Sequence, residues 1–168
     1  MAFPRTDNIY QALNIFKYLE VHINNKLAFD PLFHEVREKQ QTRTNIEEMK
    51  KVYKDETEEL PNNALIPLGT TFQVNCFVDS DHAVDRLTRC SQSGILLFCN
   101  SAPIYWYPKK QNTVEASTYG AELVALRLAA ELVVSLRYKL RMFGIPVDGI
   151  SKIFCDNESV YRNVSFAE

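Results

Sequence analysis

The order of patterned segments after residue 72 most strongly constrains how this chain can fold. Three short apolar runs come first, at residues 73–79, 94–99 and 104–107, and each has the composition of a strand. A long amphipathic segment follows at about 118–143, and a fourth apolar run covers 152–155. Short connections predict an antiparallel meander, and the long segment predicts a right-handed crossover helix leading to a parallel strand. The predicted fold class is α/β, with a mixed sheet of three antiparallel strands plus one parallel strand.

The crossover helix has clear start and stop signals. Ser117 or Thr118 is a suitable first residue, and Gly144 followed by Pro146 predicts the end. Helical spacing predicts a buried stripe formed by Tyr119, Leu123, Leu126, Ala130, Val133, Leu140 and Phe143. After the fourth strand, the sequence from Asn157 onward predicts one helical turn at most.

The N-terminal part has a different texture. Residues 8–23 place apolar side chains at three-to-four spacing, which predicts an amphipathic helix capped near Asp7. The stretch 34–60 is highly charged with a thin apolar pattern, typical of a solvated helix or linker, and 61–69 is rich in turn residues. We therefore predict three parts: an N-terminal helical tether at 1–33, a charged linker at 34–70 and an α/β domain at 71–168.

Composition narrows the class of protein. The chain is 46% hydrophobic and 24% charged, an ordinary globular profile, and has no apolar run near the ~20 residues of a membrane helix. Its four cysteines form no CxxC pair, so the sequence does not predict a zinc site. Three of them lie in apolar runs, which favours a reducing intracellular setting, cytoplasmic or nuclear. We expect no membrane partner, and the net charge of −2 gives no general support for a nucleic-acid partner. Nothing in the sequence indicates an oligomeric state.

Three acidic residues stand at the key points of this pattern. Asp79 ends the first strand, Glu122 lies one turn into the long helix and Asp156 ends the fourth strand. Each has an ordinary structural explanation: a turn aspartate beside Asp81, a helix-surface glutamate and a helix N-cap. A parallel crossover would nevertheless bring all three to one edge of the sheet. Converging carboxylates are tolerated mainly around a divalent cation, which predicts an Mg²⁺ site.

Longer motifs around these acids carry a family resemblance. The segments CFVDSDHAVDRLTRCSQSG, SAPIYWYPKKQNTVEASTYGAELVAL and IFCDNESV resemble the ribonuclease H domain of copia-type retrotransposon polyproteins. In that family the pattern runs through VDADWAGD-like, TRRSTSG-like, ISWSSKKQ-like, STEAEY-like and YCDNQSA-like stretches. Residues 8–30 are similar to the segment that closes the reverse-transcriptase part of such polyproteins. The resemblance makes 1–33 the helical end of a reverse-transcriptase-like region, in cis to a ribonuclease H-like domain at 71–168.

The resemblance implies an activity and its residues. It implies hydrolysis of RNA in RNA–DNA hybrids, with Asp79, Glu122 and Asp156 as both catalytic residues and ligands of two Mg²⁺ ions. Three residues after the third strand, Lys109, Lys110 and Gln111, are the expected nucleic-acid contacts, with a solvated turn as the alternative explanation of the lysine pair.

The resemblance also implies that the domain is incomplete. The family's last strand and helix, with a fourth acidic residue and a histidine, have no counterpart before the chain ends at Glu168. We therefore expect a fragment with weak or no activity and an exposed fourth strand. The alternatives are a non-catalytic retroelement remnant or interaction module, and a different metal-dependent transferase that uses the DxD and DNE motifs.

Overall fold

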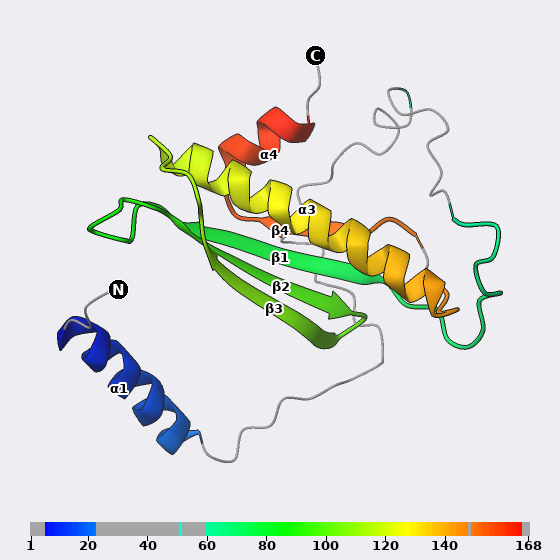
Figure 1. Cartoon of the computed structure of the whole chain (residues 1–168), viewed down its shortest axis with the longest axis horizontal. Helices are drawn as coiled ribbons and strands as arrows, with labels where there is room; N and C mark the ends of the chain where they lie inside the picture. The colour runs from blue at the N-terminus through cyan, green and yellow to red at the C-terminus, as the bar shows by residue number, and fades with distance from the viewer. Residues whose placement is uncertain (1–5, 23–50, 52–59, 148, 166–168) are drawn as a thin grey trace.

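A computed structural model of the chain describes residues 6–22, 51, 60–147 and 149–165 (Figure 1). Within them, a four-stranded sheet is crossed by a long helix, and two shorter helices lie near the chain ends. The elements are α1 Thr6–Val21, β1 Val74–Asp81, β2 Gln92–Cys99, β3 Ala102–Lys110, α3 Thr118–Met142, β4 Lys152–Cys155 and α4 Glu158–Ser165.

The sheet has the predicted mixed topology. Its strand order is β3-β2-β1-β4, with β1 and β3 antiparallel to β2 and with β4 parallel to β1. The helix α3 makes the crossover from β3 to β4, which confirms the predicted α/β class. β4 lies at an edge of the described sheet, as expected. The strand boundaries were less accurate: β1 continues to Asp81, because Ser80 and Asp81 pair with Ser93 and Gln92 of the longer β2. β3 is also longer than the predicted 104–107, because its ends continue to pair with β2.

Both ends of α3 follow the sequence signals. Ser117 is the N-cap, and its hydroxyl accepts a hydrogen bond from the Gly120 backbone at 3.2 Å. Phe143 is the C-cap, and the next residue, Gly144, has a φ of +71°, which glycine adopts without strain.

The buried face of α3 differs from the predicted stripe. Apart from Val133, the predicted residues are not fully buried, and Phe143 is 74% exposed. The face against the sheet consists instead of Ala121, Glu122, Ala125, Ala129, Val133 and Arg137. The prediction followed the largest apolar side chains, whereas a row of alanines at four-residue spacing lets the helix backbone lie close to the sheet.

The core lies between α3 and one face of the sheet. Alternation along the strands directs Val74, Cys76 and Val78 of β1 toward α3, together with residues 95, 97 and 99 of β2. On the other face, Phe77 stacks on Phe154 with ring centroids 4.8 Å apart. On β1, even-numbered positions therefore face α3, and odd-numbered positions face the other side of the sheet.

The C-terminal helix is longer than predicted. α4 runs over eight residues rather than one turn, and it is anchored by Val160, which is fully buried. Its cap is Asn157, whose Oδ1 accepts a hydrogen bond from the Val160 backbone at 3.1 Å. Asp156 is therefore not needed as the N-cap.

Of the predictions for the N-terminal part, only the presence of a helix is confirmed. α1 covers most of the predicted span and contacts none of the other described elements, with Tyr10, Leu13 and Phe16 exposed. Most of the predicted linker at 34–70 lies outside the described residues, so the division into three parts stays a prediction. None of the described helices is long and apolar enough to cross a membrane.

Candidate metal centre

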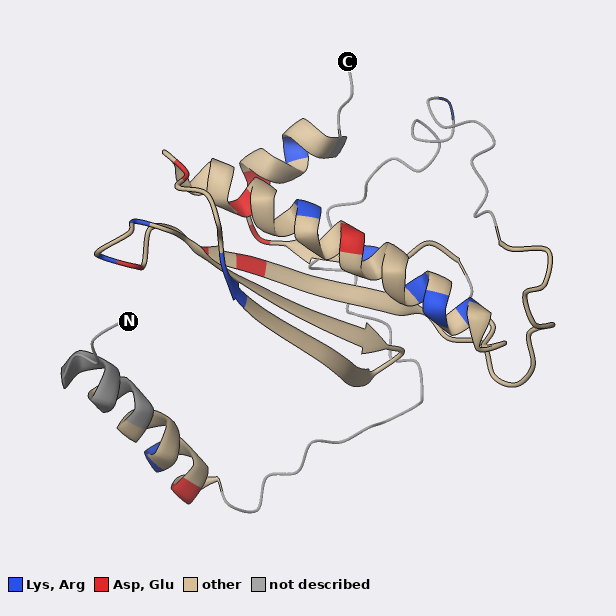
Figure 2. Cartoon of the chain, viewed as in Figure 1, with Lys and Arg blue, Asp and Glu red and all other residues tan. Residues whose placement is uncertain are grey.

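Three side chains with metal-binding atoms meet where β4 ends. Glu122 comes from the first turns of α3, Cys155 is the last residue of β4 and Asp156 follows it. One ligand atom from each lies within 4.8 Å of the other two. Acidic positions on β1, near the start of α3 and after β4 gather at the same end of the sheet in Figure 2. The group therefore combines two carboxylates with one thiol.

The parallel pairing of β1 with β4 explains why remote residues converge. The last parallel pair is Val78 with Cys155, so Asp79 and Asp156 occupy equivalent positions one residue further on. The start of α3 reaches the same end because the helix crosses the sheet on its return toward β4. The predicted convergence of strand ends and helix start is thus a consequence of topology.

Glu122 is the most constrained member of the group. Its side chain is only 6% exposed, and its Oε2 has no hydrogen-bond partner. Burial raises the pKa of Glu122; contacts with Ser80 oppose the shift, and the charges of Asp79 and Asp156 add to it. Ser80 Oγ is buried nearby and also lacks a hydrogen bond of ordinary geometry. A buried carboxylate with one unpartnered oxygen among like charges is a group that a cation would stabilise.

Asp79 lies at the margin of this group rather than within it. Its side chain is exposed, and its Oδ1 accepts a hydrogen bond from the Ser80 backbone at 2.8 Å. Strand alternation directs Asp79 and Ser80 to opposite faces of β1. The Asp79 charge still raises the pKa of both Glu122 and Cys155. Of the three predicted acids, the structure brings two into one group and leaves the third within electrostatic reach.

Cys155 was not predicted as a site residue. Its place in the apolar run 152–155 is typical of a small hydrophobic residue, but it is only half-buried. Burial raises the pKa of the thiol; the Asn157 backbone opposes this, and the charges of Glu122, Asp156 and Asp79 raise it further. Two signals in the sequence could have identified it. It precedes Asp156 directly, and it lies two residues after Ile153, so both side chains face the side of β4 that packs against the core.

The three residues expected to contact nucleic acid have different environments. Gln111 is 5% exposed, and its Nε2 donates to Ser93 Oγ and to the Ala121 carbonyl, both at 2.9 Å. It therefore joins the end of β3 to the start of α3 and does not face solvent. Lys110 forms an ion pair with Asp85, which raises the lysine pKa and lowers that of the aspartate. Lys109 lies over the Tyr107 ring, with Nζ 5.9 Å from its centroid.

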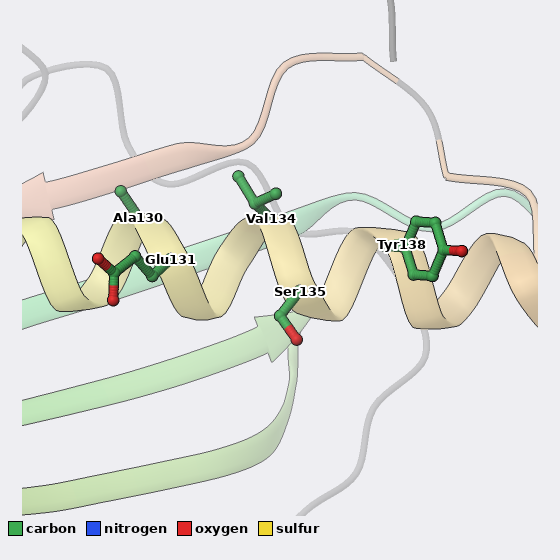
Figure 3. A pocket seen from close by; sticks show the side chains of 5 residues that line it. All are labelled: Ala130, Glu131, Val134, Ser135 and Tyr138. Carbon is green, nitrogen blue, oxygen red and sulfur yellow. The ribbon is translucent and has the colours of Figure 1, made fainter. Parts of the chain in front are cut away.

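A separate open depression lies on the outer surface of α3, away from the acidic group (Figure 3). The described residues that line it are Ala130, Glu131, Val134, Ser135 and Tyr138. All five come from this one helix, and the lining has a single charged side chain. It therefore lacks the convergent polar groups of a catalytic site.

Comparison with known proteins adds no assignment. No protein-family model matches the chain, and no solved structure matches it.

Proposed function

We propose that residues 71–168 form a ribonuclease H-like domain of a retrotransposon polyprotein, which uses divalent cations to hydrolyse RNA in RNA–DNA hybrids. The proposal rests on the sequence motifs and on a compatible sheet order, with β4 parallel to β1 and α3 as the crossover. Residues 1–33 would then close a reverse-transcriptase-like region in the same polyprotein.

One observation carries the proposal: ligand atoms of Glu122 and Asp156 lie within 4.8 Å of each other at the end of the parallel strand pair. Glu122 is buried there, and beside the contacts with Ser80 its Oε2 stays without a hydrogen-bond partner. A buried carboxylate oxygen would normally have such a partner. This environment suits a carboxylate that binds a cation.

The donor set fits Mg²⁺ in part. Glu122 and Asp156 supply the oxygen ligands that Mg²⁺ prefers, whereas Asp79 lies outside this group and acts on it through its charge. When bound at these residues, Mg²⁺ would supply an activated water and charge stabilisation at the leaving oxygen. The Cys155 thiol, which belongs to the same group, is a poor ligand for this ion. This is why we expect weak turnover.

The protein's own charges would help to position a substrate. Lys109 and Lys110 lie at the end of β3, and the Ser93–Lys109 pair brings Lys109 to the sheet face that α3 covers. Cations at this place would attract the phosphate backbone of a hybrid. Gln111 would act indirectly, by holding the start of α3, and with it Glu122, against the end of β3.

The experiment combines Mg²⁺ calorimetry with cleavage of a labelled RNA–DNA hybrid, both on the full chain. Substitutions Glu122→Gln and Asp156→Asn should weaken Mg²⁺ binding and reduce any cleavage by ~100-fold or more. Glu131→Gln is the matched control, because Glu131 lies exposed on the outer face of the same helix and pairs only with Arg127. Wild-type behaviour in both test variants would refute the proposal.

The same experiment separates the second candidate, a non-catalytic remnant. This candidate is favoured by the position of Asp79, which lies outside the group formed by Glu122, Cys155 and Asp156. Mg²⁺ binding that requires Glu122 and Asp156, without any cleavage, would identify a remnant that keeps its metal site. If the chain neither bound Mg²⁺ nor cleaved the hybrid, it would share only its fold with a ribonuclease H domain.

A further inference from the structure

The geometry points to a second metal chemistry at this site: we infer that Glu122, Cys155 and Asp156 bind a thiophilic divalent cation such as Zn²⁺, with the Cys155 sulfur as a direct ligand. This goes beyond the proposed hydrolysis, because it requires only the three side chains and no catalytic step. It shares Glu122 and Asp156 with the proposed Mg²⁺ site, so the two ions would compete.

The first support is the arrangement of the three atoms. A carboxylate oxygen of Glu122, the Cys155 Sγ and a carboxylate oxygen of Asp156 lie within 4.8 Å of one another. Ligand atoms around a tetrahedral zinc lie about 3.3–3.7 Å apart, since Zn–O and Zn–S bonds are about 2.0 and 2.3 Å long. Side-chain rotations that move each ligand atom by about 1 Å would therefore bring the three atoms within bonding distance of one ion.

The second support is independent of the cysteine. Glu122 is 94% buried, because only 6% of its surface is exposed, and its Oε2 has no hydrogen-bond partner. A buried carboxylate oxygen without a donor, on a side chain that shares a group with Cys155 and Asp156, leaves a place for a cation. The other cysteines belong to no such group among the described residues.

The ligand types decide which ion is preferred. Mg²⁺ takes oxygen ligands in octahedral geometry, and a thiol in its shell is unfavourable. Zn²⁺ accepts thiolate and carboxylate together in a tetrahedral site, and it leaves a fourth position for water. On binding, the metal–sulfur bond replaces the S–H bond, and the thiol proton passes to solvent. Zn²⁺ bound in this way would occupy both carboxylates and exclude Mg²⁺.

The test uses Co²⁺ as a spectroscopic substitute for Zn²⁺ on the full, reduced chain. Direct sulfur ligation gives a thiolate-to-cobalt charge-transfer band, which carboxylate binding alone does not give. We expect this band in the wild-type chain, its loss when Zn²⁺ displaces Co²⁺, and its absence in Cys155→Ala. Cys99→Ala is the matched control, because Cys99 is buried in β2 away from the group and should keep the band.

A second pair of variants keeps the test decisive if Cys155→Ala unfolds. Glu122→Gln and Asp156→Asn retain the thiol and should weaken Co²⁺ binding at least about tenfold while leaving the band position unchanged. A wild-type chain without the band, or a band that persists in Cys155→Ala, would overturn the inference. Because the readout needs no Mg²⁺ and no cleavage, a Cys155-dependent band in an inactive chain would support this inference while the proposed function fails.

Discussion

A carboxylate oxygen of Glu122 and one of Asp156 lie within 4.8 Å of each other, although Glu122 belongs to α3 and Asp156 follows β4. Two negative groups at this distance repel each other, and burial of Glu122 strengthens the effect because little water screens it. The fold tolerates this because the alanine row of α3 and the β1–β4 pairing fix both backbones independently. The site therefore holds electrostatic strain that protonation, substitution or a cation can relieve.

Removing the charge of Glu122 should stabilise the protein at neutral pH. The folded-state pKa of Glu122 lies above its ordinary value of 4.5, so folding favours the protonated form. Its favourable contribution is complete below the unfolded pKa and is lost as the pH rises through the folded pKa. We expect Glu122→Gln to raise the free energy of unfolding by ~1 kcal/mol at pH 7 and to have little effect near pH 4.

Urea denaturation of both proteins between pH 4 and pH 8, without divalent ions, measures this difference. Glu131→Gln should show no such pH dependence, because Glu131 is exposed. If Glu122→Gln destabilised the protein at pH 7, the folded state would stabilise the charged carboxylate overall, which would contradict its raised pKa.

Loss of the Gln111 side chain should affect folding rather than nucleic-acid binding alone. Its amide donates to Ser93 Oγ and to the Ala121 carbonyl inside the protein, so Gln111→Ala removes two buried hydrogen bonds. We expect a loss of ~1–3 kcal/mol in the free energy of unfolding, measured by urea denaturation. Lys109→Ala, two residues earlier on the same strand, should change stability by less than about 0.5 kcal/mol. Equal effects of the two substitutions would contradict the structural role of Gln111.

Much of the fold could be predicted because local signals agree with the tertiary structure. The strand at 152–155 matches β4 in full, and Ser117 and Gly144 mark the two ends of α3. The burial of α3 could not be predicted as well, since Leu123 has the stronger apolar signal but Ala125 has the closer contact with the sheet. The α3 backbone can lie close to the sheet only where the side chains between them are small. The spacing of large apolar residues does not indicate where this happens.

The site was predictable to the extent that topology determines it. Glu122 and Asp156 converge because the crossover connects parallel strands, and the sequence pattern already indicated that crossover. The orientation of Asp79 was not predictable, because β1 extends past it and alternation then directs its side chain away from Ser80. Cys155 was missed because a cysteine inside an apolar run looks like a core residue.

The alanine row of α3 provides a test of the close helix–sheet packing. Ala125 is fully buried between α3 and the sheet, so Ala125→Leu must push the helix away or force unfavourable rotamers. We expect a loss of ~1–3 kcal/mol in the free energy of unfolding, seen as a lower urea midpoint. Ala130→Leu, on the outer side of the helix, should be nearly neutral. A tolerated leucine at 125 would mean that the helix does not approach the sheet as closely as described.

The two lysines should differ in how they bind a hybrid, because Lys110 pairs with a carboxylate and Lys109 contacts an aromatic ring. Its ion pair with Asp85 must be broken or shared before it can bind a phosphate, whereas Lys109 lies only over the Tyr107 ring. In the proposed function, Lys109→Ala should therefore reduce the slope of log K against log salt by about one, and Lys110→Ala should reduce it less. Fluorescence anisotropy of a labelled hybrid at several salt concentrations, with Ca²⁺ in place of Mg²⁺ to avoid cleavage, measures both slopes. Asp85→Asn removes the charge that competes for Lys110, so Lys110 should then contribute as much to the salt slope as Lys109. Wild-type slopes in all three variants would exclude the end of β3 from the interface.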